Sequence, residues 1–333
     1  MDFVIEKYDE DCCDRWDRFI EKESMNGTFL QTRRFINYHP QGKFKDCSIV
    51  VYKGNQMVAC ILACEIRMGE KKTLYAHKGT SFGGLIIARN IYNASSISKL
   101  MDCIEEYFIQ NGYEQVYLRM TPSVFSRENT DLLDYFLFQK GYQQYNELNY
   151  YLELDDYKDD ILQKFSSSKR RDYRYSLKNP LQFRTLATKE EIKEFYGVLV
   201  SNLERLGLGC IHTLEELLDL KYNRFNDYID FYGVYMDEKM IAGSMFFSFN
   251  DEIMHTQYLA SDKQYLNCFP MDFLVYNLIE TAIAKNMKKL TFGICTENEG
   301  RFINLGLSRF KEGFGSEYCI NRTYFKLISG DDE

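Results

Sequence analysis

The stretch DFYGVYMDEKMIAGSMFFSFNDEIMHTQYLAS, residues 230–261, decides the fold. Two sets of side chains alternate within it: Ile241, Gly243, Met245, Phe247 and Phe249 on one side, and Ala242, Ser244, Phe246 and Ser248 on the other. This is the two-residue period of a β-strand. Asp237-Glu238 and Asn250-Asp251 interrupt the pattern, and the second pair is a typical hairpin signal. The stretch therefore predicts an antiparallel meander of three strands, over 230–236, 240–249 and 252–261.

The elements around this meander occur twice in the chain. After it, the apolar patterns predict a helix over 270–286, a strand over 290–294, a helix over 301–313 and a strand over 317–327. The first half repeats the order, with strands over 47–52, 57–67 and 73–77, a helix over 96–111, a strand over 115–120, a helix over 130–140 and a strand over 148–154. The shared order indicates an internal duplication. Residues 155–181 between the copies are expected to form a connecting helix.

The composition narrows the class of protein. A chain of 333 residues favours two domains. Its net charge of −8 argues mildly against a nucleic-acid-wrapping role, although a local basic groove remains compatible with it. Ten cysteines without a C-x-x-C pair predict neither a disulfide framework nor a metal site. With no long apolar run and a polar N-terminus, the chain is expected to lack a membrane span and to be cytoplasmic.

Several motifs carry a resemblance to a known family. They are His77–Leu85 (HKGTSFGGL), His255–Ser261 (HTQYLAS), Phe292–Arg301 (FGICTENEGR) and Leu307–Phe314 (LSRFKEGF). Together with the duplicated order they resemble FemAB-like acyltransferases, which are tandem GNAT-fold proteins. The resemblance implies an α/β (α+β) fold of two GNAT-like units, each a mixed, mostly antiparallel sheet flanked by helices. The units are expected at 1–155 and 156–333, with the active site in the second.

The donor is left open by the sequence. GNAT enzymes that use acetyl-CoA carry a glycine-rich loop before a helix, whose amides hold the cofactor pyrophosphate. Here the corresponding residues 262–269 read DKQYLNCF and contain no glycine. The long helical hairpin that some aminoacyl-tRNA-using members insert is also missing. Acyl-CoA and aminoacyl-tRNA both stay as expected donors, and no metal is expected.

His255 and Gln257 are expected to share one face of a central strand with Ile253 and Leu259. Two polar side chains there indicate either a polar site or a pair that is satisfied inside the core. Because this strand splays from its neighbour in GNAT proteins, the resemblance implies an acyl site, with His255 catalytic. Gln257 and Tyr258 are expected to bind substrate or donor.

Glu297 follows the buried strand that ends near Gly293. Ligands bind outside the carboxyl ends of strands in α/β sheets, so Glu297 is the leading candidate for the catalytic base and Gly293 a binding position. The structural alternative is an acid that favours a helix N-terminus. For Lys311, a solvated lysine near a helix end needs no special role, but the resemblance implies that it lies by the transferred acyl group. Asn304, two turns earlier on that helix, would share its exposed face.

Two further candidates, Arg171 and His77, do not lie on the strands of the second half of the chain. Within the basic cluster 169–174, the resemblance raises Arg171 as a phosphate clamp, and a solvated linker helix is the alternative. His77 precedes a glycine-containing loop that either approaches a ligand or merely turns the chain. His212 precedes a capping box of Thr213 and Glu216, which predicts a structural place for it, although it lies near the expected acceptor side.

The expected function is transfer of an acyl or aminoacyl group to an amine by direct attack in a ternary complex. The acceptor would be a small molecule, an amino sugar or a lipid- or sugar-linked cell-envelope precursor, with tRNA as a possible donor partner. The alternative from another class is a non-catalytic duplicated GNAT scaffold that acts in binding or assembly.

Overall fold

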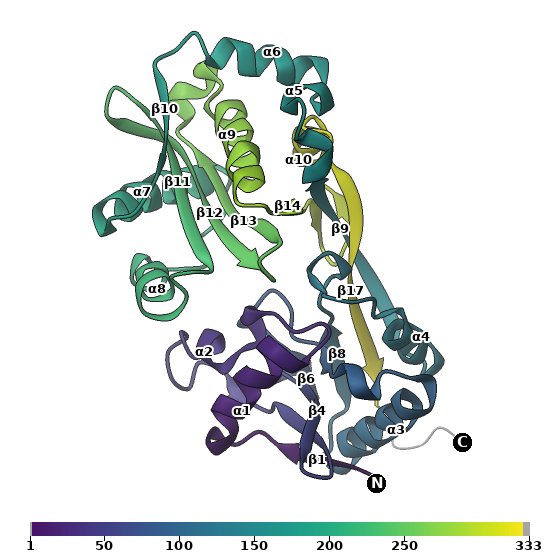
Figure 1. The fold of residues 1–333 in the computed structure, drawn as a ribbon. Coiled ribbons are helices and arrows are strands. Elements are labelled where there is room, and N and C mark those ends of the chain that lie inside the picture. The colour runs from purple at the N-terminus through teal and green to yellow at the C-terminus, as the bar shows by residue number, and fades with distance from the viewer. Residues whose placement is uncertain (1, 329–333) are drawn as a thin grey trace. The chain divides into compact units, whose positions relative to one another are not determined.

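The computed structural model describes residues 2–328, which fall into two compact units (Figure 1). Unit 1 comprises the chain up to Glu147 together with the segment from Ile320, and unit 2 comprises Leu148–Cys319. Each unit has its own core of buried apolar side chains. Within residues 2–328, no helix is long and apolar enough to cross a membrane.

Unit 1 is built from two sheets and flanking helices. The first sheet has the order β1 (Phe3–Lys7), β3 (Ile49–Lys53), β4 (Gln56–Ile61), β7 (Leu85–Ile87). The second places side by side β17 (Glu317–Leu327), β8 (Gln115–Arg119), β6 (Lys71–Ala76), β5 (Cys64–Met68) and β2 (Lys45–Asp46). The helices are α1 (Cys13–Arg18), α2 (Arg33–Ile36), α3 (Ala94–Gln110) and α4 (Asp131–Gln139).

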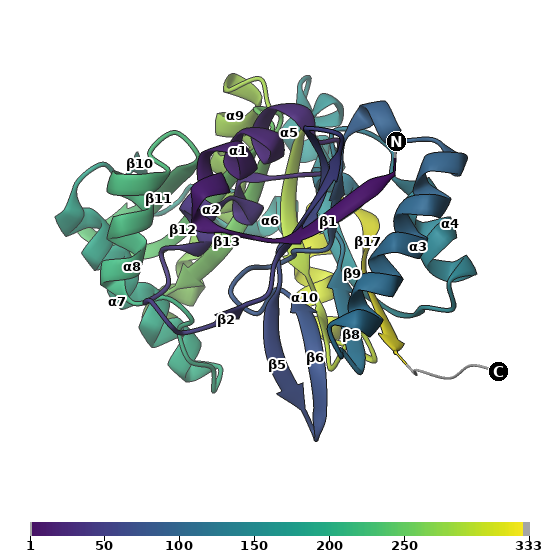
Figure 2. The same cartoon turned by 90° about the horizontal axis from the view of Figure 1, so that it is seen from below.

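Unit 2 is built on one sheet with the order β10 (Leu181–Thr185), β11 (Ile229–Met236), β12 (Lys239–Phe249), β13 (Ile253–Ser261), β14 (Lys289–Ile294) and β9 (Gln143–Glu153). Its helices are α5 (Ile161–Lys164), α6 (Ser167–Ser176), α7 (Lys189–Arg205), α8 (Leu214–Asp219), α9 (Pro270–Ala284) and α10 (Leu305–Glu312). Figure 2 shows α7 and α8 on one side of β11–β13 and α9 on the other. Neighbouring residues of β12 confirm the two faces. A Cβ added at Gly243 would contact Phe195 of α7, and the next side chain, Ala242, packs in the core on the side of α9.

The duplicated order is present in the structure, but the last strand of each copy is exchanged. β9 follows α4 in the chain, yet its Leu152 lies opposite Leu290 of β14 in unit 2. β17 follows α10, and its Phe325 lies opposite Tyr117 of β8 in unit 1. The compact units therefore do not follow the chain strictly in order. The expected mixed, mostly antiparallel sheets with flanking helices are confirmed.

Two expected elements differ from those observed. The helix expected from Arg301 begins only at Leu305, because residues 296–303 form a small hairpin and Asn304 caps the helix by accepting a hydrogen bond from Leu307 N. The single strand expected over 57–67 is two strands, β4 and β5, which belong to different sheets. Local period alone does not show a switch between sheets, since the residues on both sides of the break are equally apolar.

Candidate active site

A cleft opens in unit 2 where β13 and β14 stop pairing. The two strands run parallel and pair only over Ile253–His255 against Lys289–Thr291. Beyond these residues lies a cavity of about 330 Å³. It is lined by Asn202, Thr256, Gln257, Tyr258, Leu259, Ala260, Ser261, Met271, Phe292, Ile294, Leu307, Phe310 and Lys311. The splayed strands thus supply the opening that was expected at the motif His255–Ser261.

A β-bulge in β13 decides which side chains share a face at this cleft. Met245 of β12 lies opposite Tyr258, while the next residue, Phe246, lies opposite Thr256. Gln257 is therefore the extra residue. Since paired residues point to the same face and β12 alternates regularly, Tyr258 joins His255 on the face covered by α7. The expectation that Leu259 shares the face of His255 is wrong, because the bulge shifts the period by one residue and places Leu259 opposite Ser244.

Lys311 is the buried cation of the cleft. Its side chain sits in the last turn of α10, and the residue is 3% exposed. The ammonium donates hydrogen bonds to the carbonyl oxygens of Gly293 at 2.9 Å and Ile294 at 2.7 Å, and lies 5.4 Å from the ring centre of Tyr150. Burial lowers the pKa of Lys311 to about 8. The ammonium is thus fixed at the end of β14 and remains charged at neutral pH.

His255 lies across the same strand end. Its Nδ1 is 2.5 Å from Thr291 Oγ1, and a Cβ added at Gly293 would stand 3.4 Å from its Cε1. Burial, with the nearby charge of Lys311, lowers the pKa of His255 to about 3, so its imidazole is neutral at physiological pH. Gly293 itself has φ +70°, a conformation suited to glycine, and lies at a bulge between β14 and β9. A glycine is therefore favoured here by the backbone conformation, while the His255 ring packs against the same position.

The expected base, Glu297, lies elsewhere on the surface. It is exposed on the strand Thr296–Glu297, and its carboxylate accepts a hydrogen bond from Asn304 Nδ2 at 3.4 Å. Both residues are absent from the lining of the cleft. The structure thus places Gln257, Tyr258 and Lys311 in the lining of the cleft. Gly293 and His255 adjoin Lys311 at the end of β14, whereas Glu297 and Asn304 lie apart.

The remaining two candidates are also apart from the cleft lining. Arg171 is exposed on α6 and pairs with its neighbour Asp172 at 3.1 Å. His77 belongs to unit 1, where it is 1% exposed and its Nδ1 accepts a hydrogen bond from the Gly79 amide at 2.8 Å. Burial lowers the pKa of His77 to about 4. Roles in donor binding for Arg171 and His77 stay predictions.

One cation of the basic cluster, Lys169, turns inward. Its ammonium lies 2.8 Å from a carboxylate oxygen of Asp272 and 4.5 Å from the ring centre of Phe310. Asp272 is 6% exposed and stands in the first turn of α9, two residues after Pro270, which has no N–H. The first turn of the helix that would hold a pyrophosphate in an acetyl-CoA enzyme thus carries a buried carboxylate, paired with Lys169, and begins with a residue that has no N–H. This arrangement does not fit the CoA cradle.

Sequence reasoning missed a contact of His212. The capping box predicted beside it is confirmed, since Thr213 Oγ1 accepts from Glu216 N at 3.2 Å and the Glu216 carboxylate accepts from Thr213 N at 2.8 Å. In addition, His212 Nδ1 lies 2.6 Å from the hydroxyl oxygen of Tyr258. The two residues are 46 positions apart, so no local pattern connects them.

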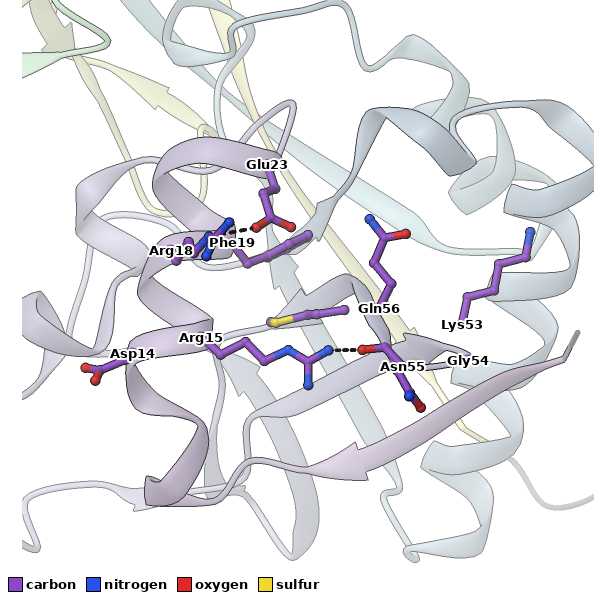
Figure 3. Close-up of a pocket in the computed structure, with 10 residues that line it drawn as sticks. Asp14, Arg15, Arg18, Phe19, Glu23, Lys53, Gly54, Asn55 and Gln56 are labelled. Carbon is purple, nitrogen blue, oxygen red and sulfur yellow. Dashed lines mark hydrogen bonds and ion pairs between the residues drawn. The ribbon is translucent and has the colours of Figure 1, made fainter.

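A larger hollow, of about 910 Å³, lies on unit 1 between α1 and the turn that joins β3 to β4 (Figure 3). Three of its charged side chains, Arg15, Arg18 and Glu23, contact nearby groups of the same surface. Arg18 pairs with Glu23 at 3.3 Å, and the Arg15 guanidinium donates to the Asn55 carbonyl and lies 4.7 Å from the ring centre of Tyr52. We place the candidate active site at the smaller cleft, where the buried ammonium of Lys311 lies at the diverging strands.

Comparison with known proteins bears on the fold of the chain. Residues 163–312 match the family model described as an acetyltransferase (GNAT) domain. The structure is similar to that of FemX, with a TM-score of 0.69, 13% identity and 97% of each chain covered. It is also similar to the C-terminal domain of a putative lysylphosphatidylglycerol synthetase from Agrobacterium fabrum, with a TM-score of 0.62, 12% identity and coverage of 95% of this chain and 91% of that one.

A tandem GNAT protein from the clavulanic acid biosynthesis pathway gives a TM-score of 0.55 at 10% identity, with 99% of this chain and 100% of that chain covered. A search of curated protein sequences finds no match to the chain. The FemAB-like tandem GNAT fold expected from the sequence is therefore confirmed.

Proposed function

We propose that the protein is an acyltransferase that moves an acyl or aminoacyl group to an amine in the cleft between β13 and β14. The acceptor amine would belong to a small molecule, an amino sugar or a cell-envelope precursor, and would attack directly in a ternary complex. The observation that carries the proposal is the buried ammonium of Lys311, held at the point where the two strands diverge, within the region that matches a GNAT domain.

In this proposal Lys311 stabilises the negative charge that develops on the acyl oxygen. An ammonium has three N–H donors, and the bonds to Gly293 and Ile294 use two of them while fixing its position. A preorganised cation in a site shielded from water stabilises a developing oxyanion strongly, and removing one such donor typically costs about 10²–10³ in rate. His255, neutral and held by Thr291, would stand next to this position, beside Gly293 on the neighbouring strand.

We further propose that the donor is an aminoacyl ester, of the kind carried by tRNA, rather than acyl-CoA. The support is the first turn of α9, where Asp272 would repel a pyrophosphate and Pro270 offers no amide. The name of the Agrobacterium fabrum relative describes an aminoacylated product, which is the same class of transfer.

The test compares the two donors on the purified protein. Radiolabelled aminoacyl-tRNA and radiolabelled acetyl-CoA are each supplied with a panel of amino sugars and small amines, and labelled amide product is measured. We expect product from aminoacyl-tRNA alone, reduced about 10²–10³-fold in Lys311→Met, on the scale of losing an oxyanion donor. Lys288→Met, an exposed lysine whose side chain is 63% accessible, is the matched control and should retain activity.

Thermal stability in the presence of CoA provides an independent check. A ligand at about 100 times its dissociation constant adds about 2.7 kcal/mol of stability. A saturable rise with CoA would contradict the donor assignment. Failure of every donor to yield product, with the fold intact, would instead support the non-catalytic scaffold.

A further inference from the structure

We infer that Tyr258 and His212 form the proton-accepting pair for the attacking amine, with the phenol facing the cleft and the imidazole behind it. The inference rests on the proposed acyl transfer and deepens it, because it assigns the proton route of the same cleft.

The pair is placed by three separate elements of unit 2. Tyr258 lines the cleft, and the bulge at Gln257 turns it to the face that α7 covers. His212 lies in the segment between α7 and α8 and is 5% exposed, with its Nδ1 2.6 Å from the Tyr258 hydroxyl. The backbone of His212 is held in turn by the hydroxyl of Tyr196, which donates to its carbonyl oxygen at 3.2 Å. The histidine is therefore fixed behind the tyrosine.

The lining of the cleft leaves few other proton acceptors. Among the lining residues of the described chain, the ionisable ones are Tyr258 and Lys311. Lys311 is a cation at neutral pH and donates to two carbonyls, so it cannot take the proton. Glu297 lies outside this lining, and His255 already shares its Nδ1 with Thr291. Tyr258 is the group whose hydroxyl connects the cleft to a further base.

The proton balance is simple. The acceptor binds as a neutral amine, and its nitrogen forms the new bond to the acyl carbon while the carbonyl electron pair moves to the oxygen beside Lys311. The amine N–H proton passes to the Tyr258 oxygen as the Tyr258 hydroxyl proton passes to His212 Nδ1. When the ester C–O bond breaks, the imidazolium returns its proton through Tyr258 to the leaving oxygen. The route requires the His212 tautomer that carries hydrogen on Nε2.

Two variants test the route in the aminoacyl-transfer assay. Tyr258→Phe removes the shuttle, and His212→Asn keeps an amide near the Nδ1 position that can bond to Tyr258 but cannot accept a proton. Each should lower kcat about 10²-fold or more with little change in KM, the range typical of a general base. The double variant should be no worse than either single one, because the two act as a unit. Tyr222→Phe, which removes a tyrosine hydroxyl that donates to the Ala187 carbonyl away from the cleft lining, is the control and should keep wild-type kcat.

A spectroscopic measurement needs no substrate. The chain has four histidines, so long-range ¹H–¹⁵N spectra resolve each imidazole, and His212 is assigned by the signal that disappears in His212→Asn. We expect the Nε2–H tautomer for His212 in the wild type and a shifted Nδ1 signal in Tyr258→Phe, with thermal melts to verify folding. An Nδ1–H tautomer would overturn the route.

The outcomes separate this inference from the proposed function. If the wild type transfers acyl groups while His212→Asn and Tyr258→Phe match it, only the proton route fails. If Glu297→Gln abolishes transfer and those two variants do not, Glu297 is the base and the route is likewise overturned. If the folded wild type yields no product from any donor, the proposed function fails, and the proton route fails with it.

Discussion

The free energy of unfolding of the wild-type protein should rise with pH above pH 8, relative to the Lys311→Met variant. Burial lowers the pKa of Lys311 from 10.5 to about 8, whereas in the unfolded chain the side chain keeps its ordinary value. Between these two values the unfolded state binds more protons than the folded state, so stability increases with pH. At neutral pH the ammonium is charged in both states, and its burial opposes folding.

The magnitude follows from the same shift. A lowering from 10.5 to about 8 corresponds to about 3 kcal/mol, at 1.36 kcal/mol per pH unit. Methionine has similar length and no charge, so its contribution should not change with pH. At neutral pH the variant loses the donor to the Gly293 and Ile294 carbonyls, which costs about 1–3 kcal/mol. The two effects oppose each other, and we expect the variant to remain folded with near-wild-type stability at neutral pH.

The assay is urea unfolding followed by far-UV circular dichroism, in steps from neutral pH to pH 10.5. Tyrosine and cysteine titrations affect both proteins equally and cancel in the difference between them. Lys288→Met, whose ammonium is exposed and pairs with Glu252, should follow the wild-type pH dependence. Parallel curves for wild type and Lys311→Met would refute the reasoning, because they would show that the ammonium of Lys311 is not buried in the folded protein.

Three further changes test the frame around the cleft. Gly293→Ala should destabilise the protein by about 1–2 kcal/mol in urea unfolding, because φ +70° is unfavourable for a residue with a Cβ. The control Gly209→Ala, whose added Cβ would meet open space, should not change stability. Equal effects of the two variants would show that the backbone at Gly293 is not strained by a side chain. Lys169→Met should lower the free energy of unfolding by about 3–5 kcal/mol at neutral pH, because it leaves Asp272 charged and buried without its partner. Burial raises the pKa of this carboxyl, and the loss of stability should shrink as the pH falls through that pKa. A loss that is independent of pH would argue against the pair. Thr213→Ala should lower stability by about 1 kcal/mol in thermal unfolding, as for loss of a helix cap, and an unchanged melting temperature would show that the cap does not form in solution.

Much of the frame could be predicted from local pattern. The helix expected from Pro270 and the strands on either side of Asn250-Asp251 are observed within a few residues, because strand period, turn residues and capping residues act over short distances. The tandem GNAT fold followed from the repeated order together with the motifs. Predictions were wrong where the same residues are compatible with two local structures. The helix expected from Arg301 begins only at Leu305, because the residues before it form a hairpin.

The sequence by itself determined the meander, the repeated element order and the neighbourhood of His255 and Lys311, since these depend on residues adjacent in the chain. Only the tertiary structure decided that the bulge at Gln257 turns Tyr258 beside His255, that His212 meets Tyr258 across 46 residues, and that Lys311 is buried while Glu297 is exposed. The physical reason is that burial and strand register are set by packing between elements remote in sequence. The same packing sets the protonation states of Lys311 and His255 and the direction of the Tyr258 side chain, on which the proposed chemistry depends.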